Sequence, residues 1–487
     1  MREGLAGGML SLVSDAHLER IHAASLSLLE DHGLMSESDL VLDLFDKGGA
    51  SVDRQSRMIR VPRSLVEAAL QSAPKSFAFH GRDPQDDLLL QPGRCFFGMG
   101  GSSEPFFWDY DTGRPRTSTK DDMVRCTRVG QSLSHIDFVM ALCSAGDVPG
   151  ELTFLHEYDA ILRNTVKPVL YGAQGRWSMA KFIELAAEAR GGESRFRERP
   201  SIMLFTHTVS PLRVSTYCEA MVDAAEFGVP IMCTPAPMMG ATSPATVAGN
   251  VVLTSAECLF LITLSQLIKP GTPVAYGPHV AVMDMVTARC TYGSAEQALG
   301  RAAIAQLGKF YGLPSFGLGG GVEAMLPDAE AAAQAMMGMF LNSLSGLTLT
   351  QTLGTLASGS YGSLEMLLIC DEMVHMLERI LTGMRVSDET LALDLIKNVG
   401  TRGNYLAEDH TAAFFRQELF FPILFRRQSI DQWMESGAAS IVLRAHERVE
   451  AILAKGEAIL LPPGADESME RVMRQATREV EAMKAGG

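Results

Sequence analysis

The 487-residue sequence is poor in the paired residues that mark metal and redox sites. None of its eight cysteines belongs to a C-x-x-C pair, and its eleven histidines form neither H-x-H nor H-E-x-x-H. Zinc sites usually show such spacings. We therefore expect no metal site, and we expect the cysteines, several of which lie in apolar runs, to be reduced and buried.

The sequence also lacks an excess of positive charge and an uninterrupted membrane-spanning run. Its 42 Lys and Arg are outnumbered by 57 Asp and Glu, which gives a net charge of −15. This balance argues against nucleic acid or anionic membranes as main partners. The longest apolar stretch, Val251–Ile268, contains Glu257 and Gln266 and is typical of a buried helix. Because the first residues lack the apolar core of a signal peptide, we expect a soluble cytoplasmic protein.

Motifs for nucleotide binding and acyl transfer are missing as well. There is no G-x-x-x-x-G-K-[ST] and no G-x-S-x-G. The run Gly319–Gly321 is compatible with a phosphate cradle, or with a tight turn that lets a ligand approach the backbone.

What the sequence does contain is an alternation of short apolar runs with helical stretches. Eight strand–helix units in series predict a (β/α)8 TIM barrel of the α/β class. The rival, a doubly wound sheet, is disfavoured because Gly98-Met-Gly100 is a poor glycine fingerprint with no helix directly after it. The predicted strands are Cys95–Met99, Asp137–Leu142, Pro168–Tyr171, Ile202–Thr206, Pro230–Thr234, Pro273–Tyr276, Pro314–Phe316 and Leu347–Gln351.

The rest of the chain divides around this barrel. Residues 1–94 are predicted to form a helical and hairpin extension, residues 95–385 the barrel, and residues 386–487 a helical C-terminal region. The aromatic stretch Phe414–Phe425 is expected to pack on the barrel or on another subunit.

Several predicted strands end in aromatic and amide residues, at the barrel end where active sites are built. Aromatic faces attract cations, and quaternary ammonium ions depend most on such cages. Each aromatic taken alone is more often a core or lid residue. The candidates are Tyr171, Gln174, Phe205, His207, Tyr276, His279, Phe316 and Gln351.

A set of motifs in a fixed order resembles the trimethylamine methyltransferase family over nearly the whole chain. The motifs are Phe79-His-Gly-Arg-Asp-Pro84, Met239-Gly-Ala-Thr-Ser-Pro-Ala-Thr-Val-Ala-Gly249, Gln266-Leu-Ile-Lys-Pro-Gly-Thr-Pro273, Met283-Asp-Met285, Tyr292-Gly-Ser-Ala-Glu296, Gly312-Leu-Pro314, Pro327-Asp-Ala329 and Gly400-Thr-Arg-Gly-Asn-Tyr-Leu406.

The resemblance implies a TIM-barrel enzyme that moves a methyl group from an amine to the Co(I) of a separate corrinoid protein. The best-known members carry pyrrolysine in the region of Leu318–Glu323, whereas this sequence contains only standard residues. It therefore resembles the members that demethylate quaternary amines such as glycine betaine. Two segments depart from the family pattern near the expected pocket, namely Val286–Ala288 and Val322–Met325.

A quaternary ammonium ion leaves as a neutral amine, so no general acid is required. We expect the aromatic residues to hold the cation, with Glu323 or Asp284 as weaker catalytic candidates. A substrate carboxylate would be held by His207, His279, Gln174, Gln351 or the backbone N–H groups near Gly320 and Gly321.

The resemblance also implies the partners. The corrinoid (cobalamin) would be supplied by the partner protein, with no tightly bound cofactor and no metal on this chain. We further expect a homo-oligomer, and docking of the corrinoid protein on loops Gly146–Gly150, Ala236–Pro244 and Gly317–Met325. The alternatives are a catalytically silent betaine-binding or scaffold subunit and a metal-dependent barrel hydrolase or lyase.

Overall fold

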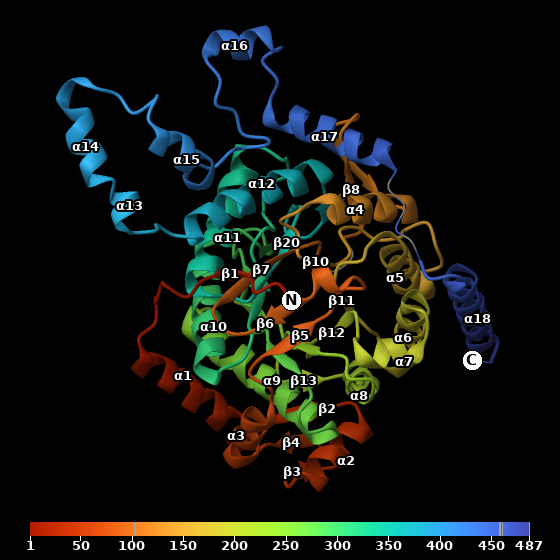
Figure 1. Cartoon of the computed structure of the whole chain (residues 1–487). Coiled ribbons are helices and arrows are strands. Elements are labelled where there is room, and N and C mark those ends of the chain that lie inside the picture. The colour runs from red at the N-terminus through yellow and green to blue at the C-terminus, as the bar shows by residue number, and fades with distance from the viewer. Residues whose placement is uncertain (102–103, 457–458, 460, 487) are drawn as a thin grey trace.

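Eight parallel strands close into a barrel at the centre of the protein (Figure 1). The computed structural model describes residues 1–101, 104–456, 459 and 461–486. The strands follow the hydrogen-bonded order β16-β14-β12-β11-β10-β7-β20-β19, and a parallel bridge between Tyr276 and Ser315 joins the two ends. Their bounds are β7 (Arg94–Met99), β10 (Phe138–Val139), β11 (Val169–Gly172), β12 (Ile202–Thr206), β14 (Ile231–Cys233), β16 (Val274–Tyr276), β19 (Phe316–Leu318) and β20 (Leu349–Leu353). Each matches a predicted strand, which confirms the TIM-barrel class.

The barrel interior is a packed core rather than a channel. Alternate strand residues point inward, among them Leu170, Met203 and Met232, and form one buried apolar cluster. The hairpin β5 (Phe77–Phe79) and β6 (Leu88–Leu90) contributes four side chains to the same cluster. Because Arg82 after β5 donates its N–H to Val166 O, just before β11, the hairpin closes the N-terminal end of the barrel. A ligand therefore has access only from the carboxyl ends of the strands.

Eight helices surround the strands, and most begin at a Ser, Thr or Asp whose side chain accepts a backbone N–H. They are α4 (Lys120–Ser132), α5 (Thr153–Asn164), α6 (Arg176–Arg190), α8 (Ala220–Glu226), α9 (Val247–Ile268), α10 (Ala295–Tyr311), α11 (Ala329–Ser345) and α12 (Leu364–Leu381). Helix α9 is apolar and long enough to cross a membrane, but 83% of its most apolar window is buried inside the protein. It is a core helix, as its internal Glu257 and Gln266 indicated.

Residues 213–227, between β12 and β14, do not form one continuous helix. Arg213–Val214 form strand β13, which pairs with β2 (Leu34–Ser36) of the N-terminal extension, and a short 3₁₀ turn (Thr216–Glu219) precedes α8. The local sequence is helix-compatible, but pairing with a strand almost two hundred residues away decides the conformation.

The N-terminal extension packs closely on the barrel. A four-stranded sheet has the order β13-β2-β4-β3 and lies beside α9. The rings of Phe45 and Phe260 stack with centroids 4.4 Å apart, and Ser25 Oγ donates to Val252 O at 3.0 Å. The elements are β1 (Leu5–Ala6), α1 (Asp15–Ser27), a π-helical turn (Leu28–His32), α2 (Asp39–Lys47), β3 (Ser51–Asp53), β4 (Met58–Arg60) and α3 (Arg63–Ser72).

Three short hairpins lie in the loops that follow barrel strands β7, β16 and β20. Strands β8 (Phe106–Asp109) and β9 (Arg114–Thr117) form the first hairpin, and β22 (Tyr361–Gly362) extends it. After β16, strands β17 (Ala281–Met283) and β18 (Cys290–Thr291) form a second hairpin, flanked by β15 (Met238–Met239). The third joins β21 (Thr355–Leu356) to β22.

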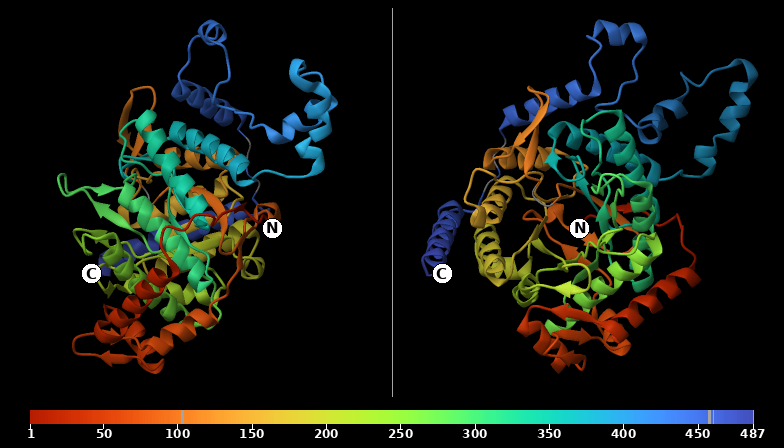
Figure 2. Two further views of the ribbon diagram at one scale, coloured as in Figure 1. Left: turned by 90° about the vertical axis from the view of Figure 1, so that its left-hand side faces the viewer. Right: turned by 180° about the vertical axis from the view of Figure 1, so that it is seen from behind.

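The C-terminal region leaves the barrel and then returns to it (Figure 2). Helices α13 (Asp388–Leu391), α14 (Leu393–Val399), α15 (Asp409–Glu418) and α16 (Ile430–Glu435) extend outward from α12. Helix α17 (Ile441–Lys455) then packs on α12 and α4, and α18 (Ala465–Gly486) packs on α6, where Trp177 Nε1 donates to Glu479 at 2.7 Å.

Candidate active site

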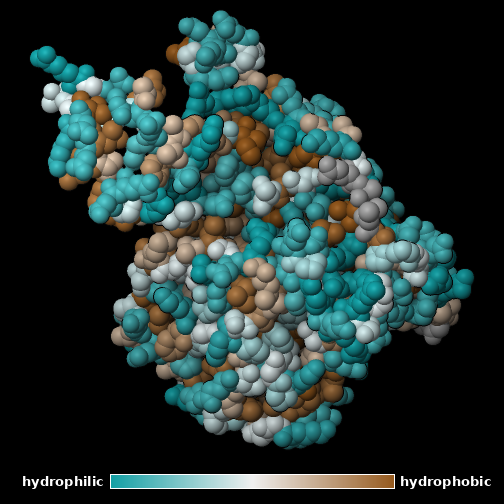
Figure 3. All heavy atoms as spheres, viewed as in Figure 1, coloured by the Kyte–Doolittle hydropathy of each residue, from teal (hydrophilic) through white to brown (hydrophobic). Residues whose placement is uncertain are grey.

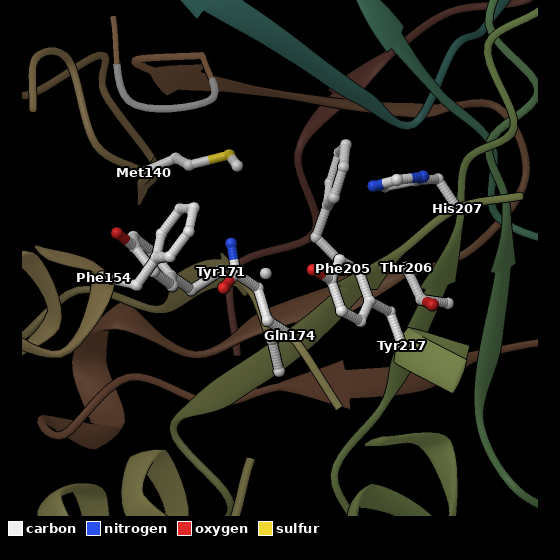
Figure 4. A pocket seen from close by; sticks show the side chains of 10 residues that line it. Met140, Phe154, Tyr171, Gln174, Phe205, Thr206, His207 and Tyr217 are labelled. Atoms are coloured by element: carbon white, nitrogen blue, oxygen red, sulfur yellow. The ribbon is translucent and has the colours of Figure 1, made fainter. Parts of the chain in front are cut away.

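A cavity of about 250 Å³ lies at the carboxyl ends of β11 and β12 (Figure 4). Its volume is below the roughly 300–1,000 Å³ of sites for drug-sized ligands, so it suits a small molecule. It lies at the barrel end where TIM-barrel enzymes act. The lining residues are Met140, Phe154, Tyr171, Gly172, Ala173, Gln174, Phe205, Thr206, His207 and Tyr217.

The lining is dominated by aromatic rings and contains no Asp, Glu, Lys or Arg. Phe205 points inward from β12 and meets the rings of His207 and Phe316 edge-on, at 6.5 and 6.1 Å between centroids. Phe154 from α5 meets Tyr171 edge-on at 6.3 Å. A cation in this cavity would be held by ring faces rather than by an ion pair.

The structure brings together four of the sequence-predicted residues, Tyr171, Gln174, Phe205 and His207. Gln174 follows β11 and His207 follows β12, and Figure 4 shows Phe205 between them. His207 Nδ1 lies 2.9 Å from Thr208 O. Because a carbonyl can only accept, Nδ1 carries the hydrogen and Nε2 is left for a ligand.

A buried carboxylate fixes the loop that carries His207. Glu257 of α9 accepts hydrogen bonds from Thr208 Oγ1 at 2.5 Å, Ser210 Oγ at 2.7 Å and Leu212 N at 2.6 Å. Burial raises the pKa of Glu257, and these three hydrogen bonds act against that rise. The geometry of His207 therefore depends on a residue that does not touch the cavity.

A second buried carboxylate fixes the other side. Glu157 of α5 accepts hydrogen bonds from Ser144 Oγ at 2.8 Å and Ala145 N at 3.0 Å, and Tyr171 donates its hydroxyl to the same group. The Tyr171 hydroxyl is thus directed toward α5, while the residue still borders the cavity. This arrangement joins the loops after β10 and β11.

Tyr276 does not belong to the cavity, and its predicted role as an aromatic cage residue is corrected. It is fully buried, its hydroxyl lies 2.6 Å from Ser255 Oγ of α9, and its ring meets Tyr311 of α10 at 5.1 Å. Its neighbour Ala275 points into the barrel, so Tyr276 must point outward to the helices. Phe316, by contrast, points inward but is fully buried in the barrel core behind Phe205.

The glycine amides are not free to bind a carboxylate, which corrects a further prediction. Gly319 N and Gly320 N donate to Gln351 O at 2.9 and 3.2 Å, and Gly321 N donates to Thr352 Oγ1 at 2.9 Å. The Gln351 side chain is also engaged, since its Nε2 donates to Gly101 O at 2.8 Å. These groups fasten the loop after β19 to β20 and to the loop after β7.

The remaining predicted residues lie outside the cavity lining. Burial beside Arg301 lowers the pKa of His279 to about 4, so this imidazole is neutral at pH 7 and offers no positive charge to a carboxylate. Asp284 is exposed at the tip of the β17–β18 hairpin and caps its own turn through Val286 N and Thr287 N, which corrects its candidate catalytic role. Glu323 is half-buried, and burial raises its pKa.

Sequence reasoning missed Glu104, which follows β7 at the same end of the barrel. Its side chain is 3% exposed, and Oε1 accepts a hydrogen bond from Thr355 Oγ1 at 3.1 Å. Within the described residues, Oε2 has no hydrogen-bond partner, and burial raises the pKa of this carboxyl to about 8. The available signal was a lone carboxyl next to Pro105 in a glycine- and aromatic-rich stretch. Met140, Phe154, Thr206 and Tyr217 were not assigned to a site either, because they belong to no motif.

Across the described ranges, no group of three or more His, Cys, Asp and Glu residues is placed to hold a metal ion. The eight cysteines are all free, and seven of them are buried.

The sequence matches a protein-family model and known proteins over almost its whole length. A family model described as trimethylamine methyltransferase (MTTB) matches residues 6–481. A trimethylamine methyltransferase of Desulfitobacterium hafniense is 35% identical over 455 residues, covering 92% of this chain and 90% of that protein. A glycine betaine methyltransferase of the same species is 30% identical over 475 residues, covering 96% and 98%.

Among solved structures, the monomethylamine methyltransferase of Methanosarcina barkeri aligns with 94% of this chain and 96% of its own, with 12% identity and a TM-score of 0.45. The family match spans almost the whole sequence, and the two relatives cover it nearly from end to end. The chain therefore belongs to the trimethylamine methyltransferase family.

Proposed function

We propose that this protein transfers a methyl group from a quaternary ammonium carboxylate of the glycine betaine type to the Co(I) of a separate corrinoid protein. The observation that carries the proposal is a small aromatic cavity without charged side chains at the open end of the barrel. The similarity to relatives named for glycine betaine and trimethylamine supports it.

The electron balance of the transfer explains why the cavity needs no acid or base. Co(I) supplies the electron pair for the new bond to carbon, and the pair of the broken C–N bond stays on nitrogen. A quaternary ammonium thus leaves as a neutral tertiary amine and needs no proton. The residues of this chain have to orient one N–CH₃ axis toward the opening and exclude water.

The lining residues divide into two roles. Phe154, Phe205 and Tyr217 offer ring faces to the trimethylammonium group. Gln174 offers amide N–H donors to the carboxylate, and His207, whose Nδ1–H is committed to Thr208 O, presents Nε2 as a further polar atom. Because polar groups and aromatic rings line the same cavity, it suits a substrate that carries both a cation and an anion.

The partner would approach from the open end, since the β5–β6 hairpin closes the other. A small apolar group is exposed on this side, at the hairpin tip (Met285, 70% exposed; Val286, 94%) and in the loop after β19 (Met325, 56%; Leu326, 47%). These residues lie in or beside the two segments that depart from the family pattern. We assign them to docking of the corrinoid protein, together with loops 146–150 and 236–244. The free cysteines support a reducing, cytoplasmic location.

The test is reconstitution with a reduced corrinoid protein. Glycine betaine should convert the Co(I) absorption spectrum to that of methyl-cobalt and release dimethylglycine, whereas trimethylamine should be inert and choline much slower. Efficient demethylation of trimethylamine would contradict the leaving-group reasoning. Tight betaine binding without transfer to any of several corrinoid proteins would favour a silent binding subunit instead.

A further inference from the structure

A second cavity, of about 240 Å³, lies at the closed end of the barrel, where α4, α5 and α17 end. Gln131 of this cavity accepts the N–H of Val166, just before β11, and Val166 O accepts the N–H of Arg82 in the closing hairpin. Figure 3 views the protein from this end, and hydrophilic residues predominate on the face that it shows. The lining residues are Arg128, Gln131, Ser132, Asn164, Arg448, Ile452, Leu453, Lys455, Gly456 and Ile459.

The lining of this cavity carries three cations, Arg128, Arg448 and Lys455, and among the described residues no Asp or Glu belongs to it. The side chains of Arg448 and Lys455 form neither an ion pair nor a hydrogen bond with any residue that the structure describes. Like charges that share a cavity repel one another unless a counter-ion lies among them. This excess of positive charge occurs in a chain whose net charge is −15.

Two other polar cavities of the protein do not have this excess. In the cavity beside the β8–β9 hairpin, Arg125 pairs with Glu450 at 3.3 Å, and both residues line the cavity. In the cavity beside β1, Arg2 pairs with Asp137, and again both residues line it. The protein therefore supplies carboxylates for these cations, but it supplies none for the cations of the α4–α5–α17 cavity.

The fixed side chains of the α4–α5–α17 cavity also have donor groups to spare. Gln131 Oε1 is occupied by Thr165 Oγ1 at 2.6 Å and Val166 N at 2.9 Å, which leaves the amide N–H groups of Gln131 for a ligand. Arg128 donates Nε–H to Oδ1 of the buried Asn164 at 2.9 Å and keeps its two terminal NH₂ groups. Positive charge together with several N–H donors is what the oxygens of a phosphate group require.

The ends of the helices account for only part of this charge. Basic residues are favoured near the C-terminus of a helix, where the last carbonyl groups carry partial negative charge. This explains Lys455 in the last turn of α17 and Arg128 near the end of α4. Arg448 lies about two turns before the end of α17, beyond the range of that effect. A ligand shared with the other two cations explains its place in the same cavity.

We propose that the α4–α5–α17 cavity binds a small, multiply charged anion of the phosphate class, held by Arg128, Arg448 and Lys455. The cavity is smaller than the roughly 300–1,000 Å³ of sites for drug-sized ligands, so it suits inorganic phosphate or a small phosphate monoester. An anion bound there connects α17 of the C-terminal region to α4 and α5 of the barrel. The proposal rests on this cavity alone and is independent of the proposed methyl transfer.

The test is isothermal titration calorimetry of the full-length protein with inorganic phosphate, at neutral pH and at an ionic strength held constant with sodium chloride. Phosphate should bind at one site per chain and raise the melting temperature, because it binds the folded state. Acetate, which carries a single charge, should bind much more weakly. Glycerol phosphate distinguishes the two sources of the anion: tighter binding than inorganic phosphate assigns the cavity to a monoester, and weaker binding assigns it to free phosphate.

The double variant Arg448→Gln and Lys455→Gln should weaken phosphate binding at least about tenfold, because it removes two charged hydrogen-bond donors. Both side chains are exposed and lack partners in the described structure, so the melting temperature without phosphate should stay unchanged. The matched control is Arg478→Gln with Lys309→Gln, which removes the same charge from exposed, unpaired side chains on α18 and in the last turn of α10.

The control variant should bind phosphate as the native protein does. Absence of phosphate binding at millimolar concentrations would overturn the proposal, and so would an equal affinity for acetate. Undiminished binding in the Arg448→Gln and Lys455→Gln variant, or an equal loss in both double variants, would overturn it as well.

Discussion

The substitution Phe205→Leu tests whether the cavity holds a cation by its ring faces. Phe205 is half-buried and borders the cavity, so loss of its ring removes one cation–π contact. Such a contact contributes about 0.5–2 kcal/mol, which corresponds to roughly 2- to 30-fold weaker binding of glycine betaine. The measurement is isothermal titration calorimetry with the purified protein.

The uncharged analogue 3,3-dimethylbutyrate separates charge from shape, because it replaces the ammonium nitrogen by carbon. Phe205→Leu should change its affinity much less than that of glycine betaine. The matched protein control is Tyr276→Phe. Tyr276 is also an aromatic residue at the end of a barrel strand, β16, but its side chain packs against α9 outside the cavity. Loss of its hydrogen bond to Ser255 should lower the free energy of unfolding by about 1 kcal/mol and leave betaine affinity unchanged. Equal weakening of both ligands by Phe205→Leu, or a betaine defect in Tyr276→Phe, would refute the assignment of the cage.

Other substitutions test the surroundings of the cavity. The pKa of Glu104 is about 8 in the folded protein and 4.5 in the unfolded chain. Between these values the folded protein keeps a proton that the unfolded chain has lost. The free energy of unfolding should therefore fall by up to about 1.4 kcal/mol per pH unit between about pH 5 and 8. Glu104→Gln should remove this dependence on pH in thermal unfolding experiments, whereas the control Asp111→Asn, at the exposed hairpin tip, should keep it. The same pH dependence in Glu104→Gln and in the native protein would contradict the raised pKa. Glu257→Gln should loosen the loop of His207, lower the melting temperature and reduce kcat/KM with betaine about tenfold, and unaltered kinetics would show that the loop does not position the substrate. Met285→Ser with Val286→Ser should raise KM for the corrinoid protein and leave betaine affinity unchanged, and the reverse pattern would remove the hairpin from the docking surface.

Features set by neighbouring residues in the chain could be predicted from the sequence, whereas features set by contacts between distant residues could not. Apolar runs and N-terminal caps are local signals, and they located all eight strands and helices such as Val247–Ile268 to within a few residues. The direction of a side chain at a strand end depends on register, which is set by neighbouring strands. For this reason Phe205 and Tyr276 were equivalent in the sequence but point to opposite sides of the barrel wall.

Long-range partners account for the other differences. The amides of Gly319–Gly321 are occupied by β20, about thirty residues later, and strand β13 exists because β2 pairs with it. Glu104 and Tyr217 became site candidates only after the fold brought the loops together. The segment 384–438 followed a normal helical pattern in the sequence, and only its exposure in the structure distinguishes it from the packed helices α17 and α18.

The hairpin that closes the N-terminal end of the barrel also has a kinetic consequence. With one end sealed by Phe77, Phe79, Leu88 and Leu90, the proposed methyl donor and the proposed corrinoid partner would have to use the same opening. A docked corrinoid protein would block entry of the amine, so binding should be ordered, with the small substrate first and the demethylated amine released last. Initial-rate measurements should then show inhibition at high concentrations of corrinoid protein, and this inhibition should be relieved by raising the concentration of the methyl donor.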